Sequence, residues 1–351
     1  MKKKLKWAMI GVALMVLLLL NAGCSQKKIV TRTDFVLDTV VTLTVYGETN
    51  EDILAEPFAL IRSLNDKFDV FSESSELSKI NQSAGIEPVK VSEDTFELIK
   101  KGLDYGRETE GAFDIAIGPL VELWNIKNPE DGKIPEIEKI HEAQKKVDYQ
   151  KVILNENDKT VFLKETGMKL NLGAIAKGYI GDRVKILMEE KGVAHGVINL
   201  GGNVVLIGGK NQRTDFNIGV ENPEDTAADP IGMLQLSGKS VVTSGDYQRY
   251  FIGEDGKRYH HILDPKTGYP SNSGLHQVTI VADSSVDADA LSTACFLLGA
   301  ERSIAYLKNF ENVEAIFVTE DNHILVTKGL EKDFVFDAAS YGKQYQLEIM
   351  E

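Results

Sequence analysis

Cysteine is scarce in this chain of 351 residues, which holds only Cys24 and Cys295. Because Cys24 ends an apolar N-terminal segment, no pair is left to form a disulfide within the folded part. Cys295 lies in the apolar stretch LSTACFLLG, which predicts a buried, unreactive thiol rather than a nucleophile. These observations argue against a disulfide framework and against cysteine chemistry.

An excess of positive charge is also missing, since 39 Lys and Arg stand against 53 Asp and Glu, for a net charge of -14. We find no cluster of basic residues in the folded part. Binding to a phosphate backbone depends on such clusters, so nucleic acid is excluded as a partner. A phosphorylated ligand would need a metal ion or local backbone donors. With 43% hydrophobic residues, the composition is that of a globular protein with a sizeable core.

The N-terminus carries the one long apolar run, and the sequence has no internal repeat. MKKKLKWAMIGVALMVLLLLNAGCS has a basic start, an apolar stretch short for a membrane span, and small residues before Cys24. NAGC is similar to a bacterial lipobox, although Asn21 stands where an aliphatic residue is usual. We expect a lipoprotein signal peptide at 1–23, a lipid on Cys24 that anchors the chain to the extracytoplasmic side of a bacterial cell membrane, and a tether at 24–33. A plain N-terminal anchor helix is the alternative.

The rest of the sequence mixes helical and strand patterns. DTVVTLTVYG alternates like a strand, and AIAKGYIGDRVKILMEEKGV carries apolar residues on one helical face up to Gly192. Most predicted strands are joined by short turns, such as the one at Asp255-Gly256. We therefore expect an α+β fold with mostly antiparallel sheets and packed helices, in a domain over 34–340 followed by a C-terminal tail at 341–351. Other expectations are helices at 51–71 and 92–111, strand pairs at 151–173, 195–209 and 314–327, a polar surface excursion at 125–150, and a strand, an acidic loop and a helix over 276–309.

The stretch RYHHILDPKTGYP holds two of the six histidines, His260 and His261. If residues 259–263 form a strand, these two side chains point to opposite faces and are poorly placed to bind one metal ion together. One of them could face a site. A structural role for either histidine is the simpler alternative.

The stretch VDADALSTA predicts oxygen ligands near a helix start. Asp287 and Asp289 are expected just before this helix, with Thr293 one turn beyond Asp289 on the same face. Such oxygens suit a hard cation such as Mg²⁺, which takes one or two carboxylates plus substrate phosphates. The alternative is that both aspartates cap the helix and complement its dipole.

The stretch LNLGAIAKGY predicts a strand that leads into a helix N-terminus. Free N–H groups there, together with Lys177, would favour an anion such as a diphosphate. The stretch matches neither the Walker A nor the Rossmann pattern, and Gly201-Gly202 in NLGGNV could simply form a turn. GAFDIAIGPLVELW is apolar enough to be core, with Asp114 as a local cap.

Taken together, five stretches resemble the ApbE family of FAD:protein FMN transferases: in order, GAFDIAIGPLVELW, LNLGAIAKGY, TSGDYQRYF, GKRYHHILDPKTGYP and DADALSTACFLLG. The resemblance extends from about residue 35 to 328. It implies an ApbE-like fold with a flavin site between its two halves. It further implies an enzyme that transfers FMN from FAD to a Thr or Ser hydroxyl of a target protein, with Mg²⁺ as cofactor and AMP released. The acceptors it implies belong to envelope redox complexes, such as sodium-pumping NADH:quinone reductase.

The resemblance also implies roles for residues. His261 occupies the place of a histidine proposed to activate the acceptor hydroxyl, and a base with a pKa near neutrality there is worth about 10²- to 10⁴-fold in rate. The metal site falls on the backbone carbonyl of Ala174 with Asp289, Thr293 and Ser292. Flavin contacts fall on Leu37, Phe71, Ala112, Phe113, Asp114, Asn171, Lys177 and Leu263.

Three positions depart from other members: Leu37 replaces a frequent methionine, Asn171 replaces an aspartate, and Ser292 stands where some members have another carboxylate. Phe71 could lie against the isoalloxazine ring, but core packing at the end of a helix is the simpler expectation. Two other functions stay open. One is a Mg²⁺-dependent FAD pyrophosphatase, in which water replaces the protein hydroxyl. The other is a non-catalytic flavin-binding lipoprotein.

Overall fold

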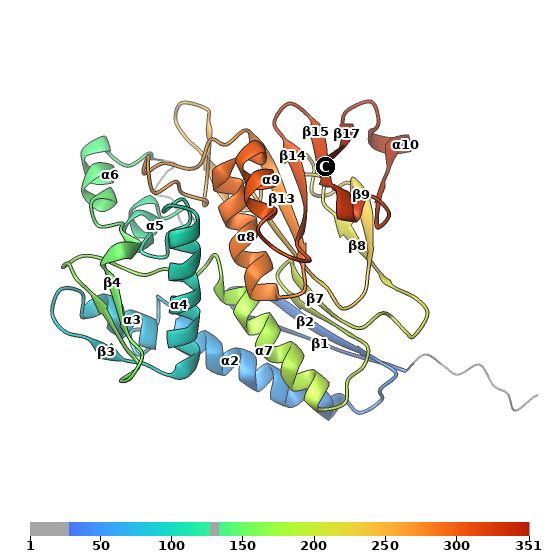
Figure 1. The fold of residues 1–351 in the computed structure, drawn as a ribbon, viewed down its shortest axis with the longest axis horizontal. Helices are drawn as coiled ribbons and strands as arrows, with labels where there is room; N and C mark the ends of the chain where they lie inside the picture. Colours follow the sequence, from blue (N-terminus) through green and yellow to red (C-terminus); the bar gives the residue numbers. More distant parts are fainter. Residues whose placement is uncertain (1–27, 127–132, 351) are drawn as a thin grey trace, which may run out of the picture.

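The computed structural model describes residues 28–126 and 133–350 (Figure 1). The predicted signal peptide, its lipobox and Cys24 lie outside the described residues. Among the helices of the described part, none combines the length and the apolar character needed to cross a bilayer.

A nine-stranded sheet in the order β1-β2-β6-β7-β10-β13-β14-β15-β17 forms the centre of the fold. Neighbouring strands pair antiparallel, except that β17 runs parallel to β15. The predicted α+β fold with mostly antiparallel sheets is therefore confirmed. The strands are β1 (Ile29–Val36), β2 (Thr39–Tyr46), β6 (Gly196–Leu200), β7 (Asn203–Ile207), β10 (Ser240–Gly245), β13 (Leu275–Ala282), β14 (Glu314–Thr319), β15 (His323–Thr327) and β17 (Gln346–Met350).

Smaller sheets and helices surround this sheet. The small sheets are β3-β5-β4, β16-β9-β8 and the hairpin β11-β12, with strands β3 (Val89–Lys90), β4 (Val152–Asn155), β5 (Thr160–Leu163), β8 (Phe216–Val220), β9 (Gly232–Leu236), β11 (Tyr250–Ile252), β12 (Arg258–His260) and β16 (Phe334–Phe336). The α-helices are α2 (Ala55–Phe68), α3 (Glu76–Gln82), α4 (Glu93–Glu108), α5 (Gly118–Trp124), α6 (Ile137–Gln144), α7 (Ala176–Glu190), α8 (Ser285–Leu298), α9 (Ala300–Leu307) and α10 (Ala338–Tyr341). Short 3₁₀ turns lie at η1 (Glu51–Leu54), η2 (Tyr149–Lys151) and η3 (Lys328–Leu330).

Both faces of the central sheet are covered by other elements. Strand β14 is therefore apolar along nearly its whole length. Ala315 and Phe317 belong to the core cluster that includes α7 and α8, whereas Ile316 and Val318 belong to a second cluster with β8, β9 and β16. Alternate residues of a strand point to opposite faces, so each layer takes every second side chain. Figure 1 shows α7 and α8 side by side on one face and β8 and β9 on the other.

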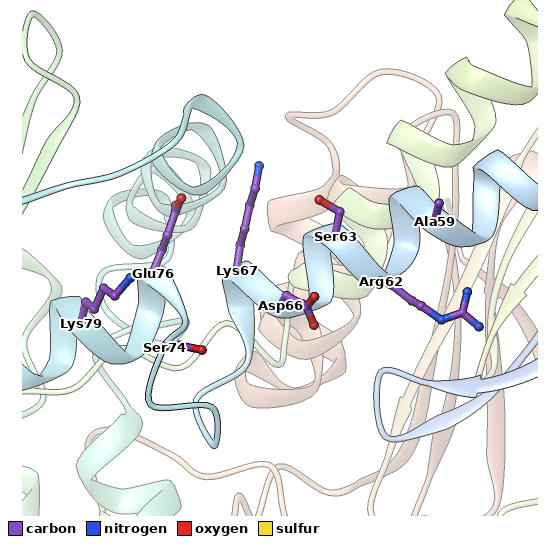
Figure 2. A pocket seen from close by; sticks show the side chains of 8 residues that line it. All are labelled: Ala59, Arg62, Ser63, Asp66, Lys67, Ser74, Glu76 and Lys79. Atoms are coloured by element: carbon purple, nitrogen blue, oxygen red, sulfur yellow. The ribbon is translucent and has the colours of Figure 1, made fainter.

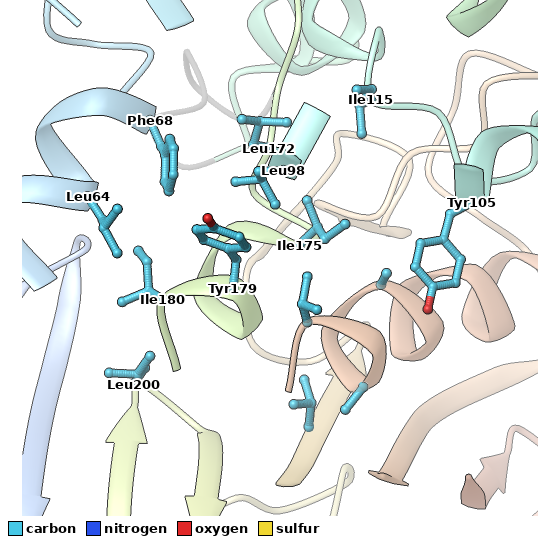
Figure 3. Close-up of a cluster of buried hydrophobic side chains, with 14 of the residues drawn as sticks. Leu64, Phe68, Leu98, Tyr105, Ile115, Leu172, Ile175, Tyr179, Ile180 and Leu200 are labelled. Atoms are coloured by element: carbon cyan, nitrogen blue, oxygen red, sulfur yellow. The ribbon is translucent and has the colours of Figure 1, made fainter. Parts of the chain in front are cut away.

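The larger core cluster joins the helices to the sheet. Figure 3 shows Leu64 and Phe68 of α2 beside Tyr179 and Ile180 of α7, with Leu200 of the sheet below them. Full burial of a Leu or Phe side chain contributes about 1.5–3 kcal/mol. This cluster therefore fixes the N-terminal end of α7 relative to the sheet and to its neighbouring helices.

The structure corrects several sequence-based boundaries. Residues 346–350 form β17, a strand of the central sheet, so the segment predicted as a tail is part of the fold. Strand β1 begins at Ile29, inside the predicted tether. The helix expected up to residue 309 is two helices, α8 and α9, because Gly299 with a φ of 78° breaks it. Strand β12 ends at His260 rather than at Leu263.

Candidate active site

Helices α7 and α8 approach each other closely at Gly178. A Cβ atom on this glycine would lie 2.2 Å from the carbonyl oxygen of Ser285 and 2.7 Å from the Cβ of Asp289. Only glycine permits this approach without a shift of the backbone. The start of α7 is thereby held against the residues of α8 that the sequence singled out.

The Asp289 carboxylate links the two helices. Its Oδ2 accepts a hydrogen bond of 2.8 Å from the N–H of Gly178, and its Oδ1 lies 3.6 Å from the Nζ of Lys177. At the start of α7, the Ala176 N–H donates to the Leu172 carbonyl at 2.8 Å and the Tyr179 N–H to the Ile175 carbonyl at 3.2 Å. The Gly178 N–H, whose helical partner would be the Ala174 carbonyl, instead serves Asp289. The structure thus brings the Ala174 turn and Asp289 together.

Three hydroxyl groups meet one turn further along α8, two from this helix and one from β10. Ser244, near the end of β10, has its Oγ 2.7 Å from the Oγ of Ser292 and 3.3 Å from the Oγ1 of Thr293. The Ser292 hydroxyl donates to the Asp289 carbonyl at 2.8 Å and is fully buried. The Ser292 hydroxyl is therefore used in hydrogen bonds inside the protein. Thr293 is partly exposed and lies at the edge of the site.

The N-terminus of α8 is not capped by Asp287 or Asp289, as the alternative interpretation had it. Ser284 is the N-cap, and the Asp182 carboxylate accepts from the N–H groups of Ser285 and Val286 at 2.8 and 2.9 Å. Asp287 lies inside the helix and binds the Lys101 ammonium and the Tyr105 hydroxyl, each at 2.6 Å. The capping part of that alternative is therefore wrong, although Asp287 lies in the first turn of α8, where its charge complements the helix dipole. Asp289 also lies inside the helix, not before it, and is left to face α7.

The two adjacent histidines have different surroundings. His260 is buried, its Nε2 lies 2.9 Å from the Ser271 carbonyl, and its ring meets the edge of Phe296 at 5.5 Å. His261 follows the end of β12 and remains partly exposed. The structural alternative therefore holds for His260, and His261 is the histidine free to face a substrate.

The hydrogen bonds of His261 define its tautomer. Its Nδ1 lies 3.3 Å from the carbonyl oxygen of Arg249, which can only accept a hydrogen bond. The proton of the neutral ring therefore resides on Nδ1, and Nε2 keeps its lone pair. Loss of hydration around the ring, followed by the nearby Arg249 charge, lowers the pKa of His261 to about 3. The imidazole is neutral at pH 7, with a pKa well below the near-neutral value that the sequence analysis assumed.

Two predicted flavin segments run side by side. Gly118 N–H donates to the Lys169 carbonyl and Asn171 N–H to the Ile115 carbonyl, which places the 112–114 run near Asn171. Ala112 and Phe113 are buried. The Asn171 Oδ1 accepts from Gly173 N–H at 2.9 Å, so this amide shapes the turn that precedes α7.

The Asp114 carboxylate is used inside the protein. It accepts hydrogen bonds from the N–H groups of Ala116 and Tyr149 at 2.7 and 2.9 Å. Burial raises the pKa of Asp114 to about 6, and these two hydrogen bonds oppose the rise. Any flavin contact along the 112–114 run would therefore come mainly from the backbone.

The remaining predicted flavin residues lie on three different elements. Leu37 and Asp38 form the turn of the β1-β2 hairpin, with φ values of 58° and 57°, as a type I′ turn requires. Leu263 is buried beside Trp124, whose indole N–H donates to the Gly268 carbonyl at 2.7 Å. Phe71 lies beyond the end of α2 with 84% of its surface exposed, so the expectation of core packing is wrong.

The chain was then compared with known proteins. The model of the ApbE family matches residues 37–317. This chain belongs to the ApbE family. The FAD:protein FMN transferase of Klebsiella pneumoniae is 39% identical over 86% of this chain and 93% of its own length, and that of Treponema pallidum is 34% identical over 88% and 89%.

Solved structures of the ApbE family share the fold. The ApbE protein of Thermotoga maritima superposes with a TM-score of 0.77 and 33% identity, covering 91% of this chain and all of that structure. The flavin transferase ApbE of Vibrio cholerae gives 0.75 and 25%, covering 84% and 94%.

The ApbE family resemblance implies Mg²⁺, and the residues present fit this ion. Ala174, Asp289 and Thr293 offer a carbonyl, a carboxylate and a hydroxyl, which are hard oxygen ligands. Within residues 28–126 and 133–350, no three His, Cys, Asp or Glu side chains are grouped to hold a metal ion. A single protein carboxylate agrees with Mg²⁺ that completes its shell with water and substrate phosphates.

The sequence analysis missed several members of this site. Ser244 and Arg249 both lie in the TSGDYQRYF stretch, but no pattern assigned either residue a role. Nothing in the sequence around Gly178 indicated its role, because that role is the close approach to α8, which is distant in the sequence. Their positions depend on contacts between segments far apart in the sequence.

A cavity of about 640 Å³ lies elsewhere, along α2 and α3 (Figure 2). It is open, most of the residues that line it are polar or charged, and none of the predicted site residues is among them. Lys67 in its wall pairs with Asp94 at 2.6 Å, and Arg62 extends toward the β1-β2 hairpin, where it pairs with Asp34. Its charges are thus largely engaged within the protein.

Proposed function

We propose that this chain transfers FMN from FAD to a Ser or Thr hydroxyl of an acceptor protein, in a Mg²⁺-dependent reaction that releases AMP. The relatives named FAD:protein FMN transferase support the transfer. The structural observation that carries the proposal is the junction of α7 and α8, where Lys177 and Asp289 meet beside the Ala174 turn. The neutral His261 lies close enough for the Lys177 charge to lower its pKa.

His261 would act on the acceptor hydroxyl. A hydroxyl is a poor nucleophile at its own pKa, so a positioned base must take its proton as the bond to phosphorus forms. The Nε2 lone pair is available because Nδ1 is held by the Arg249 carbonyl. A histidine with a pKa of about 3 is a weak base, so we expect the negative charge of the bound diphosphate to raise this pKa in the complex.

The start of α7 would hold the diphosphate. The N–H groups of Ala176 and Gly178 already donate inside the protein. The positive end of the helix dipole and the charge of Lys177 in the first turn are therefore what would favour an anion. When bound, Mg²⁺ would neutralise charge on the diphosphate and on the departing AMP. Asp289 and Thr293 with the Ala174 carbonyl are the groups that would hold this ion.

A FAD pyrophosphatase remains a second candidate for one reason: His261 is partly exposed, so water could reach the position of the acceptor hydroxyl. The two activities differ in their products. Incubation with FAD and Mg²⁺, with and without an acceptor protein, separates them. Protein-bound FMN found by mass spectrometry supports transfer, free FMN with AMP supports hydrolysis, and retained FAD without turnover would indicate a non-catalytic flavin-binding protein.

We also propose that a lipid on Cys24 anchors the chain to the extracytoplasmic side of a bacterial cell membrane. Only residues 25–28 separate Cys24 from strand β1. Such an anchor would keep the domain near the bilayer, beside acceptors in envelope redox complexes. Cys24→Ser should move the protein from the membrane fraction to the soluble fraction, and continued membrane association would overturn the proposed lipid anchor.

A further inference from the structure

Arg249 and His261 are opposite one another at the open end of the β11-β12 hairpin. Tyr250 pairs with His260, and the next pair outward joins the N–H of His261 to the carbonyl of Arg249 at 3.1 Å. Residues directly opposite in an antiparallel pair place their side chains on the same face. The register therefore puts the Arg249 and His261 side chains on one face, and Tyr250 and His260 on the other.

The opposite face of the hairpin contacts the rest of the protein through His260, while Tyr250 on that face is 42% exposed. His260 packs against Phe296 of α8, and the Arg258 guanidinium lies 4.7 Å from the centre of the Tyr250 ring. Phe296 is one helical turn beyond Thr293 on α8, so the hairpin lies against the same part of that helix as the proposed metal site. The contact with Phe296 therefore fixes the backbone of the Arg249–His261 end close to this part of α8, with the two side chains on the face opposite His260.

The Arg249 side chain is exposed and, among the residues that the structure describes, takes part in no ion pair. Two neighbouring cations are engaged: Arg258 lies 3.2 Å from Asp246, and Lys177 lies 3.6 Å from Asp289. The charges of Arg249 and Lys177 both lower the pKa of His261, which agrees with their proximity to its ring.

We propose that Arg249 binds the phosphate that is transferred and stabilises the negative charge that develops on it. This inference rests on the proposed function. In that reaction the acceptor oxygen forms a bond to the FMN phosphorus as its proton passes to His261 Nε2. The bond between this phosphorus and the bridging oxygen breaks, and its electron pair leaves with AMP. A planar guanidinium with several donors fits the oxygens of a phosphoryl group.

The test compares Arg249→Gln and Arg249→Lys with Lys257→Gln, an exposed charge at the other end of the same hairpin. Binding of FAD and of riboflavin, which lacks phosphate, is measured by flavin fluorescence. We expect Arg249→Gln to weaken FAD binding about tenfold and to leave riboflavin binding unchanged. Its kcat for AMP release should fall about 10²-fold, as on removal of one donor to a developing oxyanion. Arg249→Lys should retain part of the FAD affinity and part of the kcat. Lys257→Gln should have the FAD affinity and the kcat of the parent protein.

Two results would overturn the inference. One is an Arg249→Gln protein that matches Lys257→Gln in FAD binding and kcat. The other is an equal loss of FAD and riboflavin binding, which would indicate a general disturbance of the site. If the parent protein attaches no flavin to an acceptor, the proposed transfer fails, but the comparison of FAD with riboflavin still decides whether Arg249 contacts phosphate.

Discussion

The Lys177 ammonium lies 3.6 Å from the Oδ1 of Asp289, while the other carboxylate oxygen accepts the Gly178 N–H. One carboxylate thus meets both a positive side chain and the backbone of a second helix. Because Asp289 is 3% exposed, its charge is screened little by solvent. A divalent cation bound here would contact the same Asp289 carboxylate as the Lys177 ammonium.

Replacement of Asp289 by Asn should abolish Mg²⁺-dependent turnover while the fold is kept. The amide oxygen can still accept the Gly178 N–H, but the negative charge that would hold the cation is lost. We expect AMP formation from FAD to fall by at least about 10²-fold, because a bound metal ion contributes several kcal/mol of charge stabilisation in the transition state. A Mg²⁺ titration of AMP release measures this change.

The matched control for that experiment is Asp287→Asn on the same helix. Asp287 binds Lys101 and Tyr105, away from the start of α7, so its loss should lower the melting temperature but leave the Mg²⁺ dependence intact. An Asp289→Asn protein with the Mg²⁺ response of the parent would remove Asp289 from the metal site.

Gly178→Ala should separate α7 from α8. The added Cβ would lie 2.2 Å from the Ser285 carbonyl, so the backbones must move apart. Overpacking of this kind costs about 1–3 kcal/mol, which denaturant unfolding would measure as a lower free energy of unfolding. Glu189→Ala, an exposed position on α7, serves as the control. A Gly178→Ala protein as stable as this control would show that the contact is readily relaxed.

Local patterns in the sequence predicted most of the fold. The apolar spacing up to Met188 predicted α7, and Asp255-Gly256 predicted the β11-β12 hairpin. Both patterns involve residues that are neighbours in the sequence. Strand β17 was missed because its pairing with β15 in parallel joins segments that no short turn connects.

The site was less predictable for the same physical reason. The sequence spacing showed that Asp289 and Thr293 share a helical face, but not that Asp182 caps α8 and leaves Asp289 for α7. The low pKa of His261 arises from loss of hydration around its ring and from the Arg249 charge, which depend on tertiary packing. Residue types and order therefore indicated the chemistry, and only the fold showed which groups meet.

Phe71→Ala should weaken flavin binding without a change in stability. The ring is 84% exposed, so its removal loses little buried surface, and an aromatic contact with a flavin ring is worth about 0.5–1.5 kcal/mol. We expect the Kd for FAD and for riboflavin to rise by about 3- to 10-fold, because the contact involves the ring system common to both. Ile86→Ala, which removes another exposed apolar side chain, should change neither. Equal affinity in the two variants would exclude Phe71 from the flavin site.

His261 should make the free protein less stable in acid. An unfolded histidine has a pKa of about 6.5, whereas in the fold the pKa is about 3, so between these values the unfolded chain binds more protons than the native state. The free energy of unfolding should therefore fall as the pH is lowered from about 6.5 to about 3. His261→Gln should reduce this dependence, while His141→Gln, at an exposed position on α6, should leave it unchanged. Urea unfolding at several pH values measures the slopes. Equal slopes in the parent and His261→Gln would mean that His261 protonates in the native state as readily as in the unfolded chain.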